Sequence, residues 1–244
     1  AQRPIPSGRI SVRQAWAYVV ACSLISLTIL LTLPTVAILL GVGSLALVAA
    51  YPFMKRITWW PQAWLGLTFN WGALMGFAAA VPLAAAALLL PADIAGEFRP
   101  FLWSPASDSG HAVALAWQSY VPAVLLWIGG VFWTLGYDTI YALQDIEDDA
   151  MIGVKSSARR LASAVRPGVA VFYGLAVLFA ALAGAVAGLG LPFWIGLAAY
   201  AAHLARQVGR IDREDGALAL KLFKSNREAG LVLLAAIALG SIGL

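Results

Sequence analysis

The sequence predicts an all-α fold, a polytopic transmembrane helical bundle. Of 244 residues, 61% are hydrophobic and only 11% are charged, whereas an average soluble domain carries about 25% charged residues. So few charges cannot cover a surface in water, which excludes a water-soluble monomer. The long apolar segments also lack the strict alternation that a membrane β-barrel requires, so the spans are expected to be helices.

Seven apolar segments are candidates for spanning the membrane. A helix rises 1.5 Å per residue, so about 20 residues cross a hydrocarbon layer of about 30 Å. Pro34 separates the first two segments, and residues 188–192 form a tight connection between the fifth and sixth. We predict an external loop at 91–116, where Pro, Ser, Gly and charged residues gather. The predicted spans cover residues 14–33, 35–52, 62–90, 117–141, 167–189, 192–209 and 229–243.

The basic residues distinguish the two sides of this seven-span path. All but one of the 16 Lys and Arg residues fall in connections on one side, and only Arg99 falls on the other. The positive-inside rule places the basic side in the cytoplasm, with a cytoplasmic N-terminus and an external C-terminus. Membrane topology therefore explains the net charge of +4, and we expect the lipid bilayer rather than nucleic acid as a partner.

Two further features of the spans predict contacts. Asn70 is a polar residue inside the third span, and we expect it to make a hydrogen bond between helices. Arg206, Arg210 and Arg213 follow the i, i+4, i+7 spacing of one helix face, which favours contact with lipid headgroups.

The most informative segment is the acidic stretch that ends the fourth predicted span. Residues 138–149 hold five of the chain's 12 acidic residues. If the helix continues, Asp138, Asp145 and Asp149 fall within about 60° of one another on one face. Such carboxylates repel one another unless a cation lies between them, and their hard oxygens favour Mg²⁺ or Ca²⁺. Because Mg²⁺ leaves coordination positions to substrate phosphates, the row predicts a metal-bridged phosphate ester.

Basic residues on the same side of the membrane complement this acidic row. Lys55 and Arg56 follow the second span, and Lys155 follows the acidic stretch, so all three could neutralise phosphate oxygens. The residues alone leave open an alternative, a solvated acidic loop that only solubilises the membrane edge. Asp138 argues against that alternative, because an acid within the last turns of an apolar helix is costly and marks a functional site by default.

Three motifs, in the expected order, resemble the UbiA-type membrane prenyltransferases. The run YDTIYALQDIEDD at 137–149, followed by IGVKS at 152–156, resembles the second aspartate-rich motif of the family. It is most similar to that of the bacterial 4-hydroxybenzoate polyprenyltransferases. YPFMKR at 51–56 resembles a loop of that branch with its Tyr-x-x-x-Lys element. RPIPSG at 3–8 resembles the segment that follows the family's first aspartate motif.

The resemblance implies a reaction and a set of site residues. Members of the family join a polyprenyl diphosphate to an aromatic acid acceptor, here 4-hydroxybenzoate in ubiquinone biosynthesis, at the cytoplasmic face of the bacterial inner membrane. Mg²⁺ held by aspartates grips the diphosphate while the allylic carbon–oxygen bond ionises. Asp145 and Asp149 would bind Mg²⁺, with Asp138 as a third ligand or as a residue that orients them. The diphosphate contacts would come from Tyr51, Lys55, Lys155 and Arg56, and Arg56 has the acceptor carboxylate as its alternative.

The chain also departs from the family pattern. The family usually has nine spans and a first aspartate motif between the second and third, and nothing before Arg3 supplies that motif. We therefore expect residues 1–244 to form one N-terminally incomplete prenyltransferase domain that corresponds to the last seven spans and is inactive alone. Homogentisate, a naphthoate or a porphyrin are alternative acceptors. An ion-coupled transporter is the alternative of another class, although its acids would lie nearer the bilayer midplane.

Overall fold

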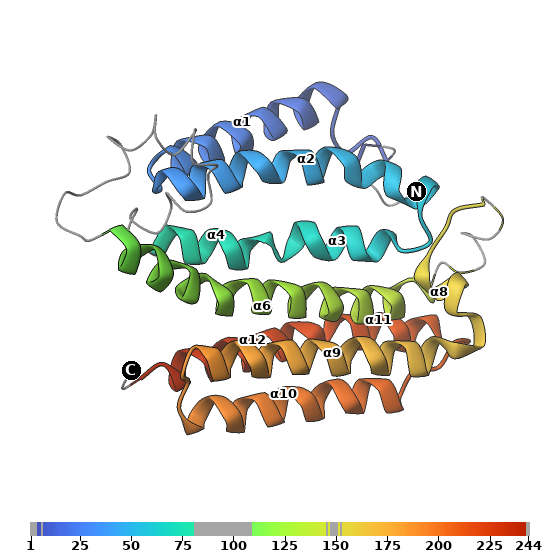
Figure 1. Ribbon diagram of the computed structural model, residues 1–244. Helices are drawn as coiled ribbons and strands as arrows, with labels where there is room; N and C mark the ends of the chain where they lie inside the picture. Colours follow the sequence, from blue (N-terminus) through green and yellow to red (C-terminus); the bar gives the residue numbers. More distant parts are fainter. Residues whose placement is uncertain are drawn as a thin grey trace.

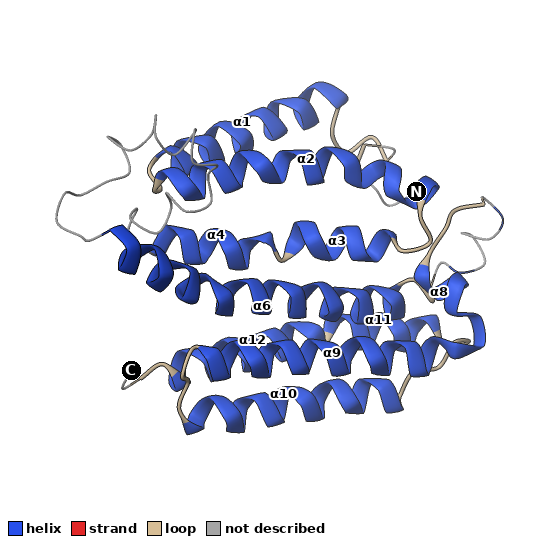
Figure 2. Ribbon diagram, viewed as in Figure 1, coloured by secondary structure: helices blue, strands red, loops and turns tan. Residues whose placement is uncertain are grey.

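The computed structural model is a bundle of helices that run side by side (Figure 1). It describes residues 4, 5, 7–80, 109–144, 146, 151 and 153–242, with the backbone alone for 109–119. Within these residues every regular element is a helix, which confirms the predicted all-α class (Figure 2). Four helical stretches are long and apolar enough to cross a membrane: 12–31, 35–57, 120–141 and 157–186.

The first two helices form a hairpin on one side of the bundle. α1 (Val12–Leu31) begins with a capping box, in which Ser11 and Gln14 each accept the other's backbone N–H. None of the α1 residues is buried, as suits a helix whose apolar side chains face lipid. α2 (Thr35–Ile57) follows directly and ends with Lys55 and Arg56 in its last turn, where cations stabilise a helix terminus.

The third predicted span is two helices rather than one. α3 (Pro61–Phe69) and α4 (Trp71–Ala80) are separated by Asn70, and residues 81–90 lie outside the described part of the chain. The Asn70 amide donates hydrogen bonds to the Gly66 carbonyl (2.9 Å) and to the Thr134 hydroxyl (2.8 Å) on the neighbouring helix α6 (Ser109–Tyr141). The predicted interhelical hydrogen bond is thus confirmed, and the same residue interrupts the helix.

The helix α6 begins earlier than expected. Its first residue is Ser109 rather than the predicted 117, so only residues up to 108 of the predicted external loop at 91–116 lie outside the described part of the chain. A glycine allows α6 and α3 to pack closely. A Cβ on Gly66 of α3 would lie only 2.9 Å from the Val131 Cα of α6.

The second half of the chain builds the main core against α6. A short α8 (Ser157–Leu161) and a 3-10 turn at 162–164 lead into α9 (Val165–Val186), which packs along α6. α10 (Leu191–Gly209) returns beside α9. The core between them is aromatic and fully buried, with Phe193 and Tyr200 each only 1% exposed.

The last helical segment is longer than the predicted span at 229–243. It begins at α11 (Gly216–Lys224) and continues, after a break at Ser225, as α12 (Asn226–Gly240). The interpretation of 210–228 as a connection was wrong because α11 is amphipathic rather than apolar. Its Ala219 and Leu222 are buried while Lys221 and Lys224 are exposed, and the Asp215 side chain caps its first turn.

The connections fall at two opposite ends of the bundle, as the charge distribution predicted. The α2–α3, α6–α8 and α10–α11 connections lie at one end, to the right in Figure 1, and most of the basic residues lie in these connections or in the helical turns next to them. The α1–α2 and α9–α10 connections lie at the other end, with the C-terminus. We call the first the charged end. Its orientation toward the cytoplasm stays a prediction.

Packing in α9 generates a first prediction. A Cβ on Gly184 would overlap the ring of Phe193, whereas Gly174 on the same helix has open space. Gly184→Val should therefore lower the free energy of unfolding by about 1–3 kcal/mol, as measured by denaturant unfolding in detergent. Gly174→Val, with the same helix-propensity change, is the matched control. Equal effects of the two substitutions would contradict this packing.

Candidate functional site

Three of the predicted site residues come together at the charged end of the bundle. Tyr51 and Lys55 lie one turn apart near the end of α2, and Asp138 lies in the last turn of α6. The Asp138 carboxylate interacts electrostatically with the Lys55 ammonium and with Tyr51. The Lys55 ammonium nitrogen and the Asp138 carboxylate oxygens lie more than 4.0 Å apart. Within the described part of the chain, only Arg227 and Glu228 are close enough to form a direct ion pair. Lys55 and Asp138 are therefore close enough to interact electrostatically without forming a direct ion pair.

Asp138 is chemically suited to a hard cation. The carboxylate is half-buried, and it makes no hydrogen bond with the residues that the structure describes. An acid held without a partner near the end of an apolar helix supplies the oxygen donor that Mg²⁺ prefers. Among the described residues no three metal-binding side chains lie close together. The helix α6 ends at Tyr141 and residues 142–144 form a turn, so the helical continuation that would align Asp138 with Asp145 and Asp149 is not observed. Asp145 and Asp149 lie outside the described residues, and their role as Mg²⁺ ligands stays a prediction.

Lys155 is brought to the same place from the far end of the acidic stretch. Its backbone N–H donates to the Lys55 carbonyl (3.1 Å), and its ammonium donates to the Ile57 carbonyl (3.2 Å). The Nζ atom also lies 5.9 Å from the centroid of the Trp59 ring. The connection after α6 is thus pinned to the end of α2, which places Lys155 beside Lys55.

Arg56 is not brought into the group. It is exposed and makes no polar contact with the described part of the chain. Its predicted contact, with either the diphosphate or the acceptor carboxylate, therefore stays a prediction.

A buried polar cluster that sequence reasoning missed holds this arrangement. The Gln62 side chain on α3 accepts the Ser157 N–H (3.2 Å). The hydroxyls of Thr139 and Ser157 lie 2.5 Å apart, and Thr139 itself donates to the Leu135 carbonyl, so Ser157 donates to Thr139. Thr139 and Ser157 are completely buried. We call Gln62, Thr139 and Ser157 the polar clasp, because they tie α3, α6 and α8 together beneath Lys155.

The residues of the polar clasp differ in how readily they could have been identified from the sequence. Thr139 lies inside the aspartate-rich motif, next to Asp138, and could have been chosen for that reason. Gln62 carries no signal in a single sequence, because a polar residue one position after Pro61 is also what an exposed helix start would contain.

Below Asp138, α6 leads into apolar space inside the bundle. Trp133 lies five residues earlier, about 7.5 Å along the helix axis, and its ring is 5.7 Å from that of Tyr137. The indole N–H donates to Asn226 (2.8 Å), which fixes the ring. Trp133 and Asn70 line a cavity of about 350 Å³.

A second apolar cavity, of about 400 Å³, adjoins the first and extends toward the opposite end of the bundle. The two share several lining residues: Gly72, Ala73, Leu126, Ala180 and Ile237. Phe77 and Leu189 line the far part. The two cavities thus form an apolar space inside the bundle that extends from Trp133 and Asn70 toward the end opposite the charged end.

Comparisons with known proteins agree with this picture. The model of the UbiA prenyltransferase family matches residues 1–237. The mitochondrial 4-hydroxybenzoate polyprenyltransferase of Rattus norvegicus is 38% identical over 243 residues, which cover 99% of this chain and 56% of that protein. The protein of the same name from Arabidopsis thaliana is 37% identical over 98% of this chain and 50% of its own length. The chain therefore spans about half the length of these curated relatives.

Solved structures support the fold. The apo structure of a UbiA homolog from Aeropyrum pernix K1 superposes with a TM-score of 0.69, covering 97% of this chain and 76% of that one at 23% identity. A structure described as digeranylgeranylglyceryl phosphate synthase superposes with a TM-score of 0.61 at 17% identity, over all of this chain and 75% of that one. Such low identities show a shared fold and nothing finer.

The polar clasp generates a second prediction. Thr139→Val keeps the side-chain shape but leaves the Ser157 hydroxyl buried without its acceptor, which should lower the free energy of unfolding by about 1–3 kcal/mol. Thr68→Val is the matched control, because Thr68 donates only to the carbonyl of Trp64 in its own helix. Thermal unfolding in detergent would measure both, and equal shifts would show that the clasp contributes nothing beyond a local bond.

Proposed function

This chain belongs to the UbiA prenyltransferase family, and from that premise we propose that it transfers a polyprenyl group from a polyprenyl diphosphate to the ring of 4-hydroxybenzoate, in ubiquinone biosynthesis. One observation carries the proposal. Asp138, whose carboxylate has no hydrogen-bond partner among the described residues, lies near the Lys55 ammonium at the charged end, on the same helix whose Trp133 lines the first apolar cavity. The names of the relatives support 4-hydroxybenzoate as the acceptor.

The residues at the charged end would bind the diphosphate. Lys55 and Lys155, joined through their backbones, present two cations to the diphosphate oxygens, and the Tyr51 hydroxyl adds a hydrogen bond. Asp138, Asp145 and Asp149 would hold Mg²⁺, which when bound supplies electrostatic stabilisation of the departing diphosphate. The polar clasp keeps Lys155 in place during the reaction without touching the substrate.

The two adjoining cavities would take the prenyl tail. Their lining is mostly apolar, so burial of isoprene units there is favourable by about 25 cal/mol per Å² of apolar surface. Trp133 stands between the charged end and this space, with its ring fixed by Asn226 and Tyr200. The ring therefore marks the passage from diphosphate to tail.

We further propose that the chain resides in a bacterial inner membrane with the charged end facing the cytoplasm. The gathering of basic residues at that end supports this orientation. The curated relatives named above are mitochondrial proteins. The proposed location therefore rests on charge distribution and motif resemblance.

Substitutions at the charged end test the reaction. Asp138→Asn and Lys55→Gln should each lower Mg²⁺-dependent transfer of labelled polyprenyl to 4-hydroxybenzoate about 100-fold or more. The first removes a carboxylate proposed to hold Mg²⁺, and the second removes a cation directed at the diphosphate oxygens. Lys221→Gln, an exposed substitution on α11 with the same charge change as Lys55→Gln, should leave transfer unchanged. Mg²⁺-dependent binding of farnesyl diphosphate to the same chain gives a second readout that does not require turnover. Binding that survives both substitutions would contradict the proposal.

A separate substitution tests the tail site. Gly76 lines the far cavity with no atom within 4 Å of an added Cβ, so Gly76→Leu should fold normally while filling that space. We expect affinity for a long-chain polyprenyl diphosphate to fall about tenfold, with geranyl diphosphate affinity unchanged. Gly43→Leu, at an exposed position of α2 with equally open space, is the control. Equal effects on long and short donors would place the tail elsewhere.

A further inference from the structure

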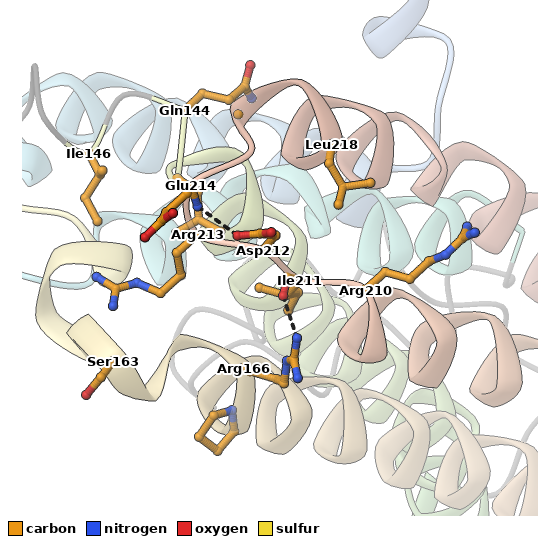
Figure 3. Close-up of a pocket in the computed structure, with 13 residues that line it drawn as sticks. Gln144, Ile146, Ser163, Arg166, Arg210, Ile211, Asp212, Arg213, Glu214 and Leu218 are labelled. Carbon is orange, nitrogen blue, oxygen red and sulfur yellow. Dashed lines mark hydrogen bonds between the residues drawn. The ribbon is translucent and has the colours of Figure 1, made fainter.

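A large polar pocket lies at the charged end, apart from the residues assigned above. It has a volume of about 1210 Å³, and it is bounded by the end of α6, the start of α9 and the α10–α11 connection. Figure 3 shows its lining residues. None of Tyr51, Lys55, Asp138 or Lys155 is among them.

The wall formed by the α10–α11 connection is built from its own hydrogen bonds. Ile211 is buried, and its carbonyl accepts a hydrogen bond from the Arg166 guanidinium (2.7 Å), drawn as a dashed line in Figure 3. The Asp212 carboxylate accepts the Glu214 N–H (3.0 Å), and Asp215 caps α11. The connection is therefore ordered before any ligand binds, and Arg166 is held at a fixed position on α9.

The charges of the lining residues identify the class of ligand. Three arginines and two acids line the pocket, which leaves one net positive charge. Because α10 ends at Gly209, Arg210 and Arg213 lie in the connection and do not share a helix face with Arg206 as predicted. The guanidinium groups of Arg210 and Arg213 make no hydrogen bond or ion pair with the described part of the chain. In Figure 3, Arg213 extends on the side of Ile146 and Ser163, and Arg210 lies on the other side of Asp212, beside Leu218. The arginines are thus distributed along the pocket, and the N–H groups of Arg210 and Arg213 are available to bind a ligand.

The remaining lining is apolar, which further restricts the class of ligand that the pocket suits. Leu143, Ile146, Pro167 and Leu218 contribute hydrocarbon surface beside the guanidinium groups. Free phosphate or diphosphate offers no apolar part and carries more negative charge than the pocket balances. A phosphodiester carries one negative charge, and in a phospholipid it is attached to glycerol and acyl chains.

We propose that this pocket binds the phosphodiester headgroup of an anionic phospholipid. Guanidinium groups recognise phosphate oxygens through paired hydrogen bonds, and basic pockets between transmembrane helices at the charged side suit such headgroups. A bound lipid would contact Gln144 and Ile146, the residues on either side of Asp145. The site thus links the lipid surface to the acidic stretch. The inference does not depend on the proposed reaction, and it can fail or hold independently.

The test measures lipid binding by the full 244-residue chain. The protein is placed in phosphatidylcholine nanodiscs, and phosphatidylglycerol binding is followed by native mass spectrometry. Arg213→Gln, which removes no contact made within the described residues, should weaken phosphatidylglycerol binding about tenfold. Arg160→Gln, the same charge change at an exposed position of α8 outside the pocket, is the control and should have no effect.

Three results would overturn the inference. If Arg160→Gln weakened phosphatidylglycerol binding as much as Arg213→Gln, lipid binding would depend only on the overall charge of the protein. Phosphatidylcholine bound as tightly as phosphatidylglycerol would remove the preference for an anion. Displacement of the lipid by inorganic diphosphate at comparable concentration would identify a free-anion site instead. We expect phosphatidylglycerol binding to weaken in Arg213→Gln and to stay unchanged in Arg160→Gln. We also expect that inorganic diphosphate does not displace the bound lipid.

Discussion

Polar side chains inside an apolar bundle must find hydrogen-bond partners, and in this molecule those partners join helices to α6. Asn70 bonds Thr134, which in turn donates to Tyr137. The polar clasp ties α6 to α3 and α8 through Thr139. On the opposite face of α6, Trp133 bonds Asn226, which belongs to a network with Gln207 and Tyr173. Because a buried polar group without a partner costs about 1–3 kcal/mol, these three networks fix how the helices meet.

Against this background the carboxylate of Asp138 is the exception. It lies on the same helix, one residue from the clasp and one from Tyr137, yet it has no hydrogen-bond partner among the described residues. The hydroxyl of the adjacent Thr139 donates to the Leu135 carbonyl instead. The charge that acts on the Asp138 carboxylate within the described residues, the Lys55 ammonium, lies more than 4.0 Å away. A site built in this way keeps its carboxylate and its cation available for a ligand.

How far the sequence could predict these features depends on the physical signal that each one leaves. Length and hydropathy are sufficient for the long spans, and charge placement is sufficient for the two ends of the bundle. The break at Asn70 was not predicted, because hydropathy cannot tell an amide that bonds a neighbouring helix from one that also interrupts its own. α11 was missed since its face is half polar. The clasp depends on contacts between residues about 95 positions apart, Gln62 and Ser157, which one sequence does not reveal.

The break between α11 and α12 connects the hydrogen-bond networks to the candidate site. Asn226 donates to the carbonyls of Leu222 and Phe223 at the end of α11, where the Ser225 hydroxyl also donates to the Leu222 carbonyl. The break therefore costs little, and it lets α11 follow the end of α6. Phe223 then packs against Tyr141 and Tyr137, with ring centroids 4.7 and 5.7 Å apart. Since these tyrosines flank Asp138 on α6, the amphipathic helix α11 covers the site from the side away from Lys55. One residue, Asn226, thus fixes both Trp133 at the entrance to the apolar space and the helix that encloses the charged end.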